Sequence, residues 1–322
     1  MRTVDIHAHV IPSALKTMAE DGTLKNVTFQ GDSIVFDGTA RHPCTPLFCS
    51  GEARLAWMGE HRVDCMAVSV TPRLFFYELP AELGARAAQQ FNDELLDLER
   101  KYPGRQIAVG TLPLQDPVLG VRELRRLAQN GVRLVQIGTS VNGRALSAPE
   151  LEPFWSAAEE LRVAVMLHPL ITREFPLMGD YHLANLVGNP WQTTAAAADL
   201  IFSGVFQRYP GLRVLLVHGG GFLPYQLGRL RHGYQVRREC RGIGRDPEEF
   251  FHKNLWFDGL THSRESLGFL LKTAGRGKVL LGSDYPYDMA EYDQRQKMEA
   301  LGCSPEEILE VCGQNALEFL GG

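Results

Sequence analysis

The chain has 322 residues, of which 44% are hydrophobic and 22% charged, and its formal net charge is −5. This composition is ordinary for a globular protein, and the dispersed charges exclude the clustered basic face of a nucleic-acid-binding protein. No apolar run reaches the roughly 18 residues of a membrane span, and the charged, histidine-containing N-terminus lacks the apolar core of a signal peptide. We therefore expect a cytoplasmic protein with neither a nucleic-acid nor a membrane partner.

The chain opens with a predicted strand that ends in two histidines. Val4-Asp5-Ile6 is followed by His7 and His9, and side chains two apart in a strand point to the same side. Neutral imidazole is a good ligand for zinc and similar divalent metals. The pair by itself is equally compatible with two ordinary histidines, so the remaining sequence decides between these interpretations.

The next segment has the pattern of a β-hairpin. Residues 27–30 and 33–36 are β-rich and flank Gly31-Asp32, which is a two-residue turn. Residues 41–50 contain two prolines and are predicted to be irregular. We interpret residues 23–50 as an insertion on the first strand-to-helix connection, because they are too few to form a core of their own.

From residue 64 onward, apolar strands alternate regularly with helical patterns. Near-continuous apolar strands are typical of a parallel sheet covered by helices, and eight strand–helix units in this length predict a distorted (β/α)8 barrel. A doubly wound sheet is the alternative, but the first turn lacks a glycine-rich phosphate loop. Residues 289–322 are predicted to be C-terminal helices, and residues 1–322 to form one domain. The seven strands predicted after the first are 64–70, 106–112, 132–137, 163–167, 214–217, 255–257 and 278–281.

Three further strands end in residues that can bind a metal. His168 ends the fifth strand, His218 the sixth, and Asp284 follows the eighth. The carboxyl ends of barrel strands share one face, where active sites lie. Three histidines and one carboxylate can hold a divalent metal and leave positions open. The fourth strand offers neither lysine nor glutamate to bridge two ions, which favours a single metal.

His218 precedes three glycines, which allow the backbone to approach a ligand closely. Imidazole titrates near neutral pH, so we assign His218 as a general acid or base that does not bind the metal. The alternative, in which His218 binds the metal and His168 does not, stays open on the sequence.

Several motifs together resemble the amidohydrolase superfamily. They are Asp-Ile-His-Ala-His at residues 5–9, Leu-His-Pro at 167–169, Val-His-Gly-Gly-Gly at 217–221 and Gly-Ser-Asp-Tyr-Pro at 282–286. Residues 187–194 and 204–210 are similar to one branch, that of 2-amino-3-carboxymuconate-6-semialdehyde decarboxylase and related non-oxidative decarboxylases. The likeness extends over nearly the whole chain.

This resemblance implies a distorted barrel with one divalent metal, usually zinc, with manganese or iron as alternatives, and no organic cofactor. It implies His218 as the acid or base that handles a proton, with Asp284 as a second candidate. It also implies a homodimer in which Arg229 reaches the substrate carboxylate of the partner subunit. The implied metal ligands are His7, His9, His168 and Asp284.

One feature departs from that branch. The second carboxylate-binding arginine has no equivalent in residues 43–52, and Arg73 is the candidate replacement, since a guanidinium fork suits carboxylates. Phe76 and Trp191 are candidates to line an apolar substrate pocket, although core packing is the alternative for each. His262 follows the seventh strand and is interpreted as a residue that supports the metal ligands.

The leading hypothesis is a metal-dependent decarboxylase of a small unsaturated or aromatic carboxylic acid. A hydrolase or hydratase of a small acid, lactone or amide would use the same site. A metal-containing barrel without catalytic activity is the third possibility, and it predicts a missing ligand or a blocked pocket.

The six cysteines lack CxxC spacing, and we expect free, mostly buried thiols. Cys44 and Cys49 have no second pair to complete a structural zinc site. The six are Cys44, Cys49, Cys65, Cys240, Cys303 and Cys312.

Overall fold

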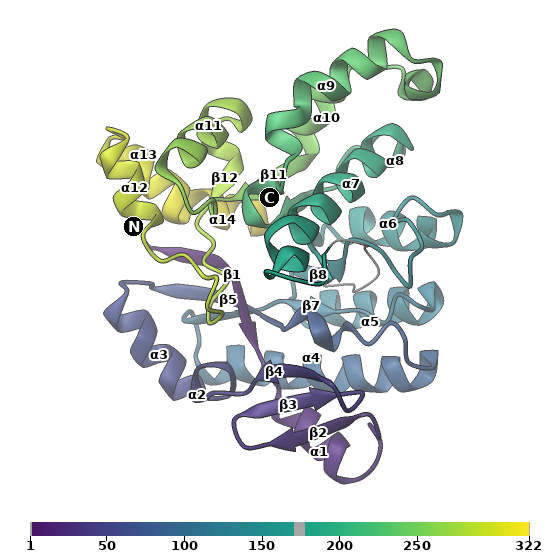
Figure 1. The fold of residues 1–322 in the computed structure, drawn as a ribbon, viewed down its shortest axis with the longest axis vertical. Coiled ribbons are helices and arrows are strands. Elements are labelled where there is room, and N and C mark those ends of the chain that lie inside the picture. Colours follow the sequence, from purple (N-terminus) through teal and green to yellow (C-terminus); the bar gives the residue numbers. More distant parts are fainter. Residues whose placement is uncertain (1, 171–177, 322) are drawn as a thin grey trace.

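The computed structural model describes residues 2–170 and 178–321. Parallel strands form its centre, and helices surround them (Figure 1). The strands hydrogen-bond in two groups, in the orders β1-β5-β6 and β12-β11-β10-β9-β8-β7. Their bounds are β1 Val4–Val10, β5 Cys65–Val70, β6 Gln106–Ala108, β7 Gly110–Thr111, β8 Leu134–Gly138, β9 Ala164–His168, β10 Val214–Leu216, β11 Leu255–Asp258 and β12 Val279–Leu280.

Backbone hydrogen bonds join the two strand groups at both seams. Val109, which lies between β6 and β7, donates its N–H to the carbonyl of Val68 on β5 at 3.0 Å. At the other seam, Ile6 of β1 donates to the carbonyl of Leu281 at 2.9 Å. Strands β6 and β7 therefore act as one interrupted strand. The eight strands follow the predicted order, and the distorted (β/α)8 barrel is confirmed.

Helices follow the strands as the periodicity predicts, and none in the described residues is long and apolar enough to cross a membrane. The α-helices are α3 Gly51–Glu60, α4 Ala81–Lys101, α5 Pro117–Gln129, α6 Glu152–Glu160, α7 Asn189–Phe202, α8 Val205–Arg208, α9 Leu223–Val236, α10 Pro247–Asn254, α11 Arg264–Ala274, α12 Gln294–Ala300, α13 Pro305–Leu309 and α14 Asn315–Gly321. Short 3-10 or π turns are η1 Pro72–Phe75, η2 Pro149–Leu151, η3 Ala184–Gly188, η4 His218–Gly220, η5 Arg238–Ile243, η6 Arg276–Lys278 and η7 Glu310–Gln314.

The segment after β1 contains the predicted hairpin and a third strand that the sequence did not predict. It lies at the bottom of Figure 1 beside α1. Strand β4 pairs antiparallel with β3, but only alternate residues of β4 are half-buried and the rest are exposed. An edge strand with so little apolar surface has no clear hydrophobic pattern. The elements are α1 Ser13–Glu20, β2 Val27–Gln30, β3 Ser33–Phe36, β4 Ala40–Pro43 and α2 Pro46–Cys49.

A β-bulge in β1 divides that strand between the barrel core and the site. Asp5 pairs with Met66 of β5 and Ala8 pairs with Val68, so Ile6 and His7 stand opposite a single residue. Ile6 packs in the apolar interior cluster, which also contains residues of α14. Bulges re-aim side chains and are common next to active sites. Here the bulge lets β1 fill the interior with Ile6 and still direct His7 to the strand-end site.

Candidate metal centre

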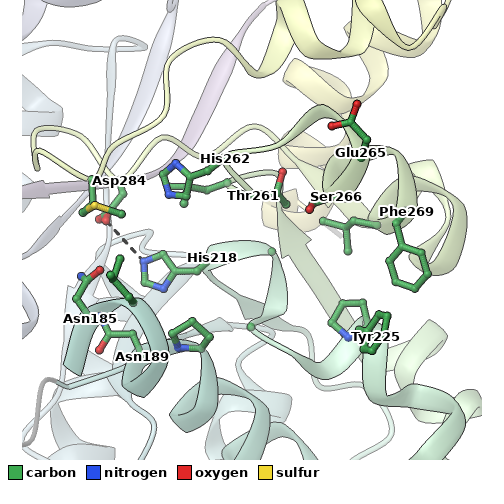
Figure 2. A pocket seen from close by; sticks show the side chains of 18 residues that line it. Asn185, Asn189, His218, Tyr225, Thr261, His262, Glu265, Ser266, Phe269 and Asp284 are labelled. Atoms are coloured by element: carbon green, nitrogen blue, oxygen red, sulfur yellow. Dashed lines mark ion pairs between the residues drawn. The ribbon is translucent and has the colours of Figure 1, made fainter. Parts of the chain in front are cut away.

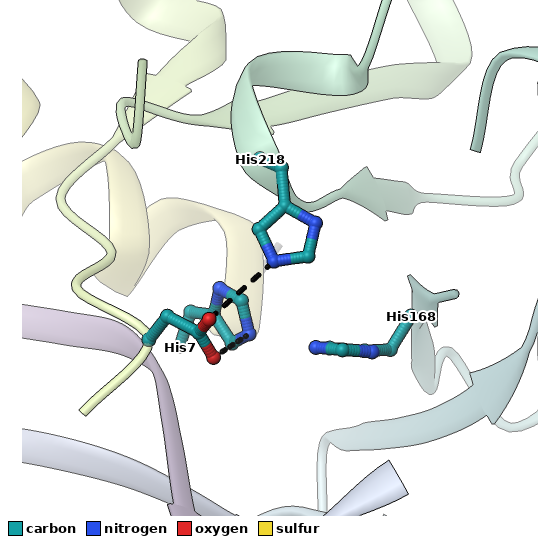
Figure 3. A group of neighbouring side chains, drawn as sticks. His7, His168 and His218 are labelled. Atoms are coloured by element: carbon teal, nitrogen blue, oxygen red, sulfur yellow. Dashed lines mark ion pairs between the residues drawn. The ribbon is translucent and has the colours of Figure 1, made fainter. Parts of the chain in front are cut away.

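Four strand ends bring five predicted residues together at one place. Ligand atoms of His7, His168, His218 and Asp284 all lie within 4.8 Å of one another. Figure 3 shows the rings of the three histidines turned toward a common point. His9 completes the group, because its Nε2 lies 3.1 Å from Nε2 of His7 and 2.9 Å from Oδ1 of Asp284.

The backbone and one carboxylate fix the orientation of three of these imidazoles. Nδ1 of His7 lies 2.8 Å from Oδ2 of Asp258, Nδ1 of His9 lies 3.2 Å from the carbonyl of Val70, and Nδ1 of His168 lies 2.8 Å from the carbonyl of Pro169. Each acceptor takes the Nδ1–H, so Nε2 carries the lone pair that faces the other ligands. This is the tautomer that a metal-binding histidine requires.

The inward-facing atoms fit a cation. Two Nε2 lone pairs that face each other at 3.1 Å cannot hydrogen-bond, as is the case for His7 and His9. Tetrahedral zinc, with Zn–N bonds of about 2.0–2.1 Å, holds two nitrogens about 3.3 Å apart. Nε2 of His168 and Oδ1 of Asp284 are buried and have no hydrogen-bond partner among the described residues. Acceptors buried together in this way are costly unless a cation satisfies them.

The electrostatics favour the unprotonated, metal-binding forms of Asp284, His9 and His168. At His7, burial lowers the pKa, but the charge of Asp284 and the hydrogen bond to Asp258 raise it above its usual value. Burial alone would raise the pKa of Asp284, but the neighbouring imidazoles of His7, His218 and His9 bring that pKa well below its usual value. Burial lowers the pKa of His168 well below that of a free histidine, and the neighbouring histidines lower it further. A carboxylate and a neutral imidazole therefore face each other at neutral pH.

His218 stands at the wall of a cavity of about 520 Å³ (Figure 2). Its Nε2 lies 3.6 Å from Oδ2 of Asp284, and its side chain is 15% exposed. The backbone turns sharply at this point, with φ values of +56° at His218 and +62° at Gly221. A Cβ at Gly221 would lie 2.2 Å from the carbonyl oxygen of Pro190. Glycine at this position therefore lets α7 pack against the turn that carries His218.

The walls of this cavity are largely apolar. Its described lining contains His218, His262, Asp284 and Glu265 but no lysine or arginine. Tyr225 lies at its edge and is 77% exposed. The cavity therefore combines acidic and imidazole groups with an apolar wall. No arginine or lysine of the described lining faces the predicted metal ligands.

A second cavity, of about 750 Å³, contains the three predicted pocket residues Arg73, Phe76 and Trp191. The guanidinium of Arg73 lies 3.9 Å from the Asp37 carboxylate and stacks over the ring of Phe36 at 5.2 Å from its centroid. Phe76 is 2% exposed and packs mainly in the core, whereas Trp191 is 44% exposed. The residues predicted to bind substrate thus line a different cavity from His218 and Asp284.

The two remaining predicted residues lie away from the ligand atoms. Arg229 is exposed on α9 and lines neither cavity. His262 lines the first cavity, but its side chain is 46% exposed and its Nδ1 lies 3.7 Å from Glu291. The Nδ1 atoms of His7, His9 and His168 face Asp258 and the carbonyls of Val70 and Pro169, so a supporting role for His262 stays a prediction.

Two supporting groups were missed by the sequence reasoning. Asp258 ends β11 and holds His7. A carboxylate at the end of an apolar strand was a signal that could have identified it. Ser69 donates to Oε1 of Gln136 at 2.7 Å, and Gln136 donates to the carbonyl of Val70 at 3.0 Å, the same carbonyl that holds His9. Ser69 and Gln136 are polar residues within otherwise apolar strands, and this pattern could have identified them from the sequence.

Comparisons with known proteins agree with this geometry. A family model described as amidohydrolase matches residues 4–322. The chain is 33% identical over 328 residues to 2-amino-3-carboxymuconate-6-semialdehyde decarboxylase of Dictyostelium discoideum, covering 99% of this chain and 91% of that protein. It resembles the crystal structure of Metarhizium anisopliae IDCase with a TM-score of 0.87 and 25% identity, over 99% and 97% of the two chains. It also shares its fold with 5-carboxyvanillate decarboxylase of Novosphingobium aromaticivorans, crystallised with manganese and 4-hydroxy-3-methoxy-5-nitrobenzoic acid, with a TM-score of 0.83 and 23% identity over 100% and 96% of the chains.

Proposed function

The chain belongs to the amidohydrolase family, and from that premise we propose that it is a metal-dependent decarboxylase of a small unsaturated or aromatic carboxylic acid. The reaction uses no organic cofactor. The observation that carries the proposal is the set of inward-facing imidazole and carboxylate lone pairs beside the cavity histidine His218. The decarboxylase names of the relatives supply the reaction class.

We assign one divalent cation to His7, His9, His168 and Asp284. Once bound, such a cation acts as a Lewis acid that stabilises negative charge developing on the substrate. Zinc suits three imidazoles and one carboxylate, and the manganese in the 5-carboxyvanillate decarboxylase structure makes manganese an equal candidate. Metal analysis of the protein purified without added metal distinguishes the two.

His218 supplies the proton. Cleavage of the bond between carbon and carboxylate releases carbon dioxide and leaves the electron pair on carbon, which must take up one proton. His218 lines the cavity and is not tied through Nδ1 to an acceptor among the described residues. Nε2 of His218 lies 3.6 Å from Oδ2 of Asp284, so the imidazole is placed beside the residues assigned to the metal, where the substrate carboxylate would lie.

The cavity supports an aromatic or otherwise unsaturated substrate. Its walls present Phe269, Leu270 and Met289 to a planar apolar body. Because the described lining holds no lysine or arginine, the substrate carboxylate depends on the metal cluster for its positive partner. Any second carboxylate is assigned to Arg229 of the partner subunit in a homodimer, or to Arg73 where the substrate extends into the second cavity. We assign residues 1–322 to one domain, and the protein to the cytoplasm.

A screen of aromatic and muconate-type acids tests the proposal. The metal-loaded protein is incubated with each acid, and carbon dioxide release is measured together with the product mass. Release of one carbon dioxide per product, without incorporation of solvent oxygen, is expected. Incorporation of water into the product without carbon dioxide release would identify a hydrolase or hydratase instead.

Replacing His218 by asparagine tests the division of roles. We expect kcat to fall about 10²- to 10⁴-fold, the range typical of a lost general acid or base, while the metal content stays at one per chain. Loss of the metal in His218→Asn would identify His218 as a ligand. Full activity would remove it from the mechanism altogether.

A further inference from the structure

Cys44 and Cys49 form a close thiol pair on the segment that follows β4. Their sulfur atoms lie 3.2 Å apart, nearer than two sulfurs in ordinary contact, and a disulfide requires about 2.05 Å. The backbone N–H of Cys44 donates to the carbonyl of Asp32 in the hairpin turn, and the N–H of Cys49 donates to the carbonyl of Thr45 at the start of α2. Different elements therefore hold the two cysteines in place, and the sulfurs need to close by only about 1.1 Å.

The pair is open to small oxidants. Cys49 is exposed and Cys44 is half-buried, whereas Cys65 and Cys312 are buried. Arg54, at 1% exposed, is buried near Cys49, and its Nε and Nη1 have no hydrogen-bond partner among the described residues. A guanidinium without a partner favours negative charge on a neighbouring sulfur. Desolvation and the neighbouring Cys44 nevertheless raise the pKa of Cys49 to about 12, and the proposal holds whichever sulfur of the pair attacks the oxidant first.

The same segment reaches the metal centre. Phe48, next to Cys49, packs with ring centroids 5.2 Å from both His42 and Tyr287. The Tyr287 hydroxyl hydrogen-bonds to Nε2 of His42 at 2.8 Å, and the Tyr287 ring lies 5.3 Å from the ring of His9. Phe48 is adjacent to Cys49 in the sequence, and His42 lies two residues before Cys44. Both contact Tyr287, which packs against the predicted metal ligand His9.

We propose that Cys44 and Cys49 form a reversible disulfide that changes the packing of Phe48 and His42 beside the metal centre. With hydrogen peroxide, one of the two sulfurs attacks the O–O bond to give a sulfenic acid and water. The other sulfur then displaces hydroxide, which leaves as a second water with the proton of that second thiol. The two sulfurs lose two electrons in total and the peroxide gains two. A dithiol such as dithiothreitol reverses the step by exchange.

Peptide mass analysis of the full-length protein tests the chemistry. Trypsin, which cleaves after Arg41 and Arg54, releases residues 42–54 as one peptide that contains both cysteines. After limited peroxide treatment and alkylation, this peptide is expected to lose about 2 Da relative to the reduced, unalkylated form and to carry no alkyl group. Dithiothreitol should restore two alkylation sites. Two alkylated thiols after peroxide, or separate sulfinic acids on either cysteine, would overturn the disulfide.

Matched variants separate this pair from the other thiols. Cys44→Ser and Cys49→Ser should each abolish the 2 Da loss, whereas Cys240→Ser, which removes another half-buried thiol, should retain it. A 2 Da loss that persists in either single variant would contradict the pairing.

The effect on the site rests on the proposed function and has its own measurement. Displacement by about 1 Å can cost up to about 100-fold in rate, and oxidation is expected to lower kcat about tenfold, reversibly and only when both cysteines are present. Unchanged kcat in fully oxidised protein would overturn the effect on the site while leaving the disulfide established. A protein without decarboxylase activity would fail in the substrate screen but still give the peptide result.

Discussion

The predicted metal ligands and the cavity that contains Arg73 differ in how their side chains are held in place. Exposure in the cluster is 0% for His7 and His9, 5% for His168 and 6% for Asp284, and strands or strand ends carry all four. The Arg73 side chain is 42% exposed and lies on the short turn η1, and Trp191 is 44% exposed on α7. A buried, hydrogen-bonded set is arranged before any ligand arrives. Exposed loop and helix residues can change the choice of substrate without disturbing that set.

Removing one buried ligand is expected to have the largest effect. His168→Ala takes away an imidazole whose Nε2 faces the cluster, and we expect metal content well below one per chain and a fall in kcat of about 10³-fold or more. Metal analysis and turnover measure both. His232→Ala, which changes an exposed histidine on α9, is the control and should behave as the unmodified protein. Full metal content and activity in His168→Ala would exclude His168 as a ligand.

Weakening a hydrogen bond that orients a ligand should lower metal affinity less than removing the ligand does. Asp258→Asn keeps the shape of the side chain beside Nδ1 of His7 but removes its charge, and such changes typically lower metal affinity about 10- to 100-fold. Competition with a chelator measures the affinity. Asp97→Asn, in a surface ion pair with Arg100, provides the comparison. Equal affinity in the two variants would contradict a supporting role for Asp258.

The Arg73 cavity should respond in KM rather than in kcat. Arg73→Ala removes the guanidinium from that cavity, and we expect KM for a dicarboxylic substrate to rise about tenfold, the loss of one exposed charge-assisted contact. Monocarboxylic substrates should be unaffected. Arg125→Ala, which breaks a surface ion pair with Glu160, should change neither constant. A fall in kcat with unchanged KM would place Arg73 in the chemical step instead.

The smallest effect concerns the pH dependence of stability. Burial lowers the pKa of His42 to about 4, whereas a histidine in an unfolded chain titrates near 6.5. As the pH falls from about 6.5 to about 4, the unfolded chain takes up a proton that the folded chain does not, so the free energy of unfolding decreases by about 2 to 3 kcal/mol. Urea unfolding of His42→Gln should show a shallower decrease across this window. Parallel pH profiles of the two proteins would contradict a neutral, half-buried His42.

The sequence predicts the positions of the residues better in the first of these two regions than in the second. His7 and His9 lie in the C-terminal half of β1, His168 ends β9, and His218 and Asp284 follow β10 and β12. The strands of a parallel barrel end on one face. Their convergence therefore follows from the strand pattern. Arg73 and Trp191 lie on a turn and a helix, and no periodicity places such residues relative to the strand ends. The sequence assigned them to the substrate pocket, but the structure places them in a second cavity.

The sequence by itself predicted the eight strands, most of the helices between them and the residues at the strand ends, because the spacing of apolar side chains is local information. Helices α3 and α10 were not predicted. Only the tertiary structure decided how these residues are supported. Asp258 holds His7 from 251 positions away, and the bulge that directs His7 toward the cluster depends on its register with β5. The thiol pair likewise exists because the hairpin turn and α2 each fix one cysteine. Such contacts depend on how distant segments pack together, and the pattern within any one segment does not record them.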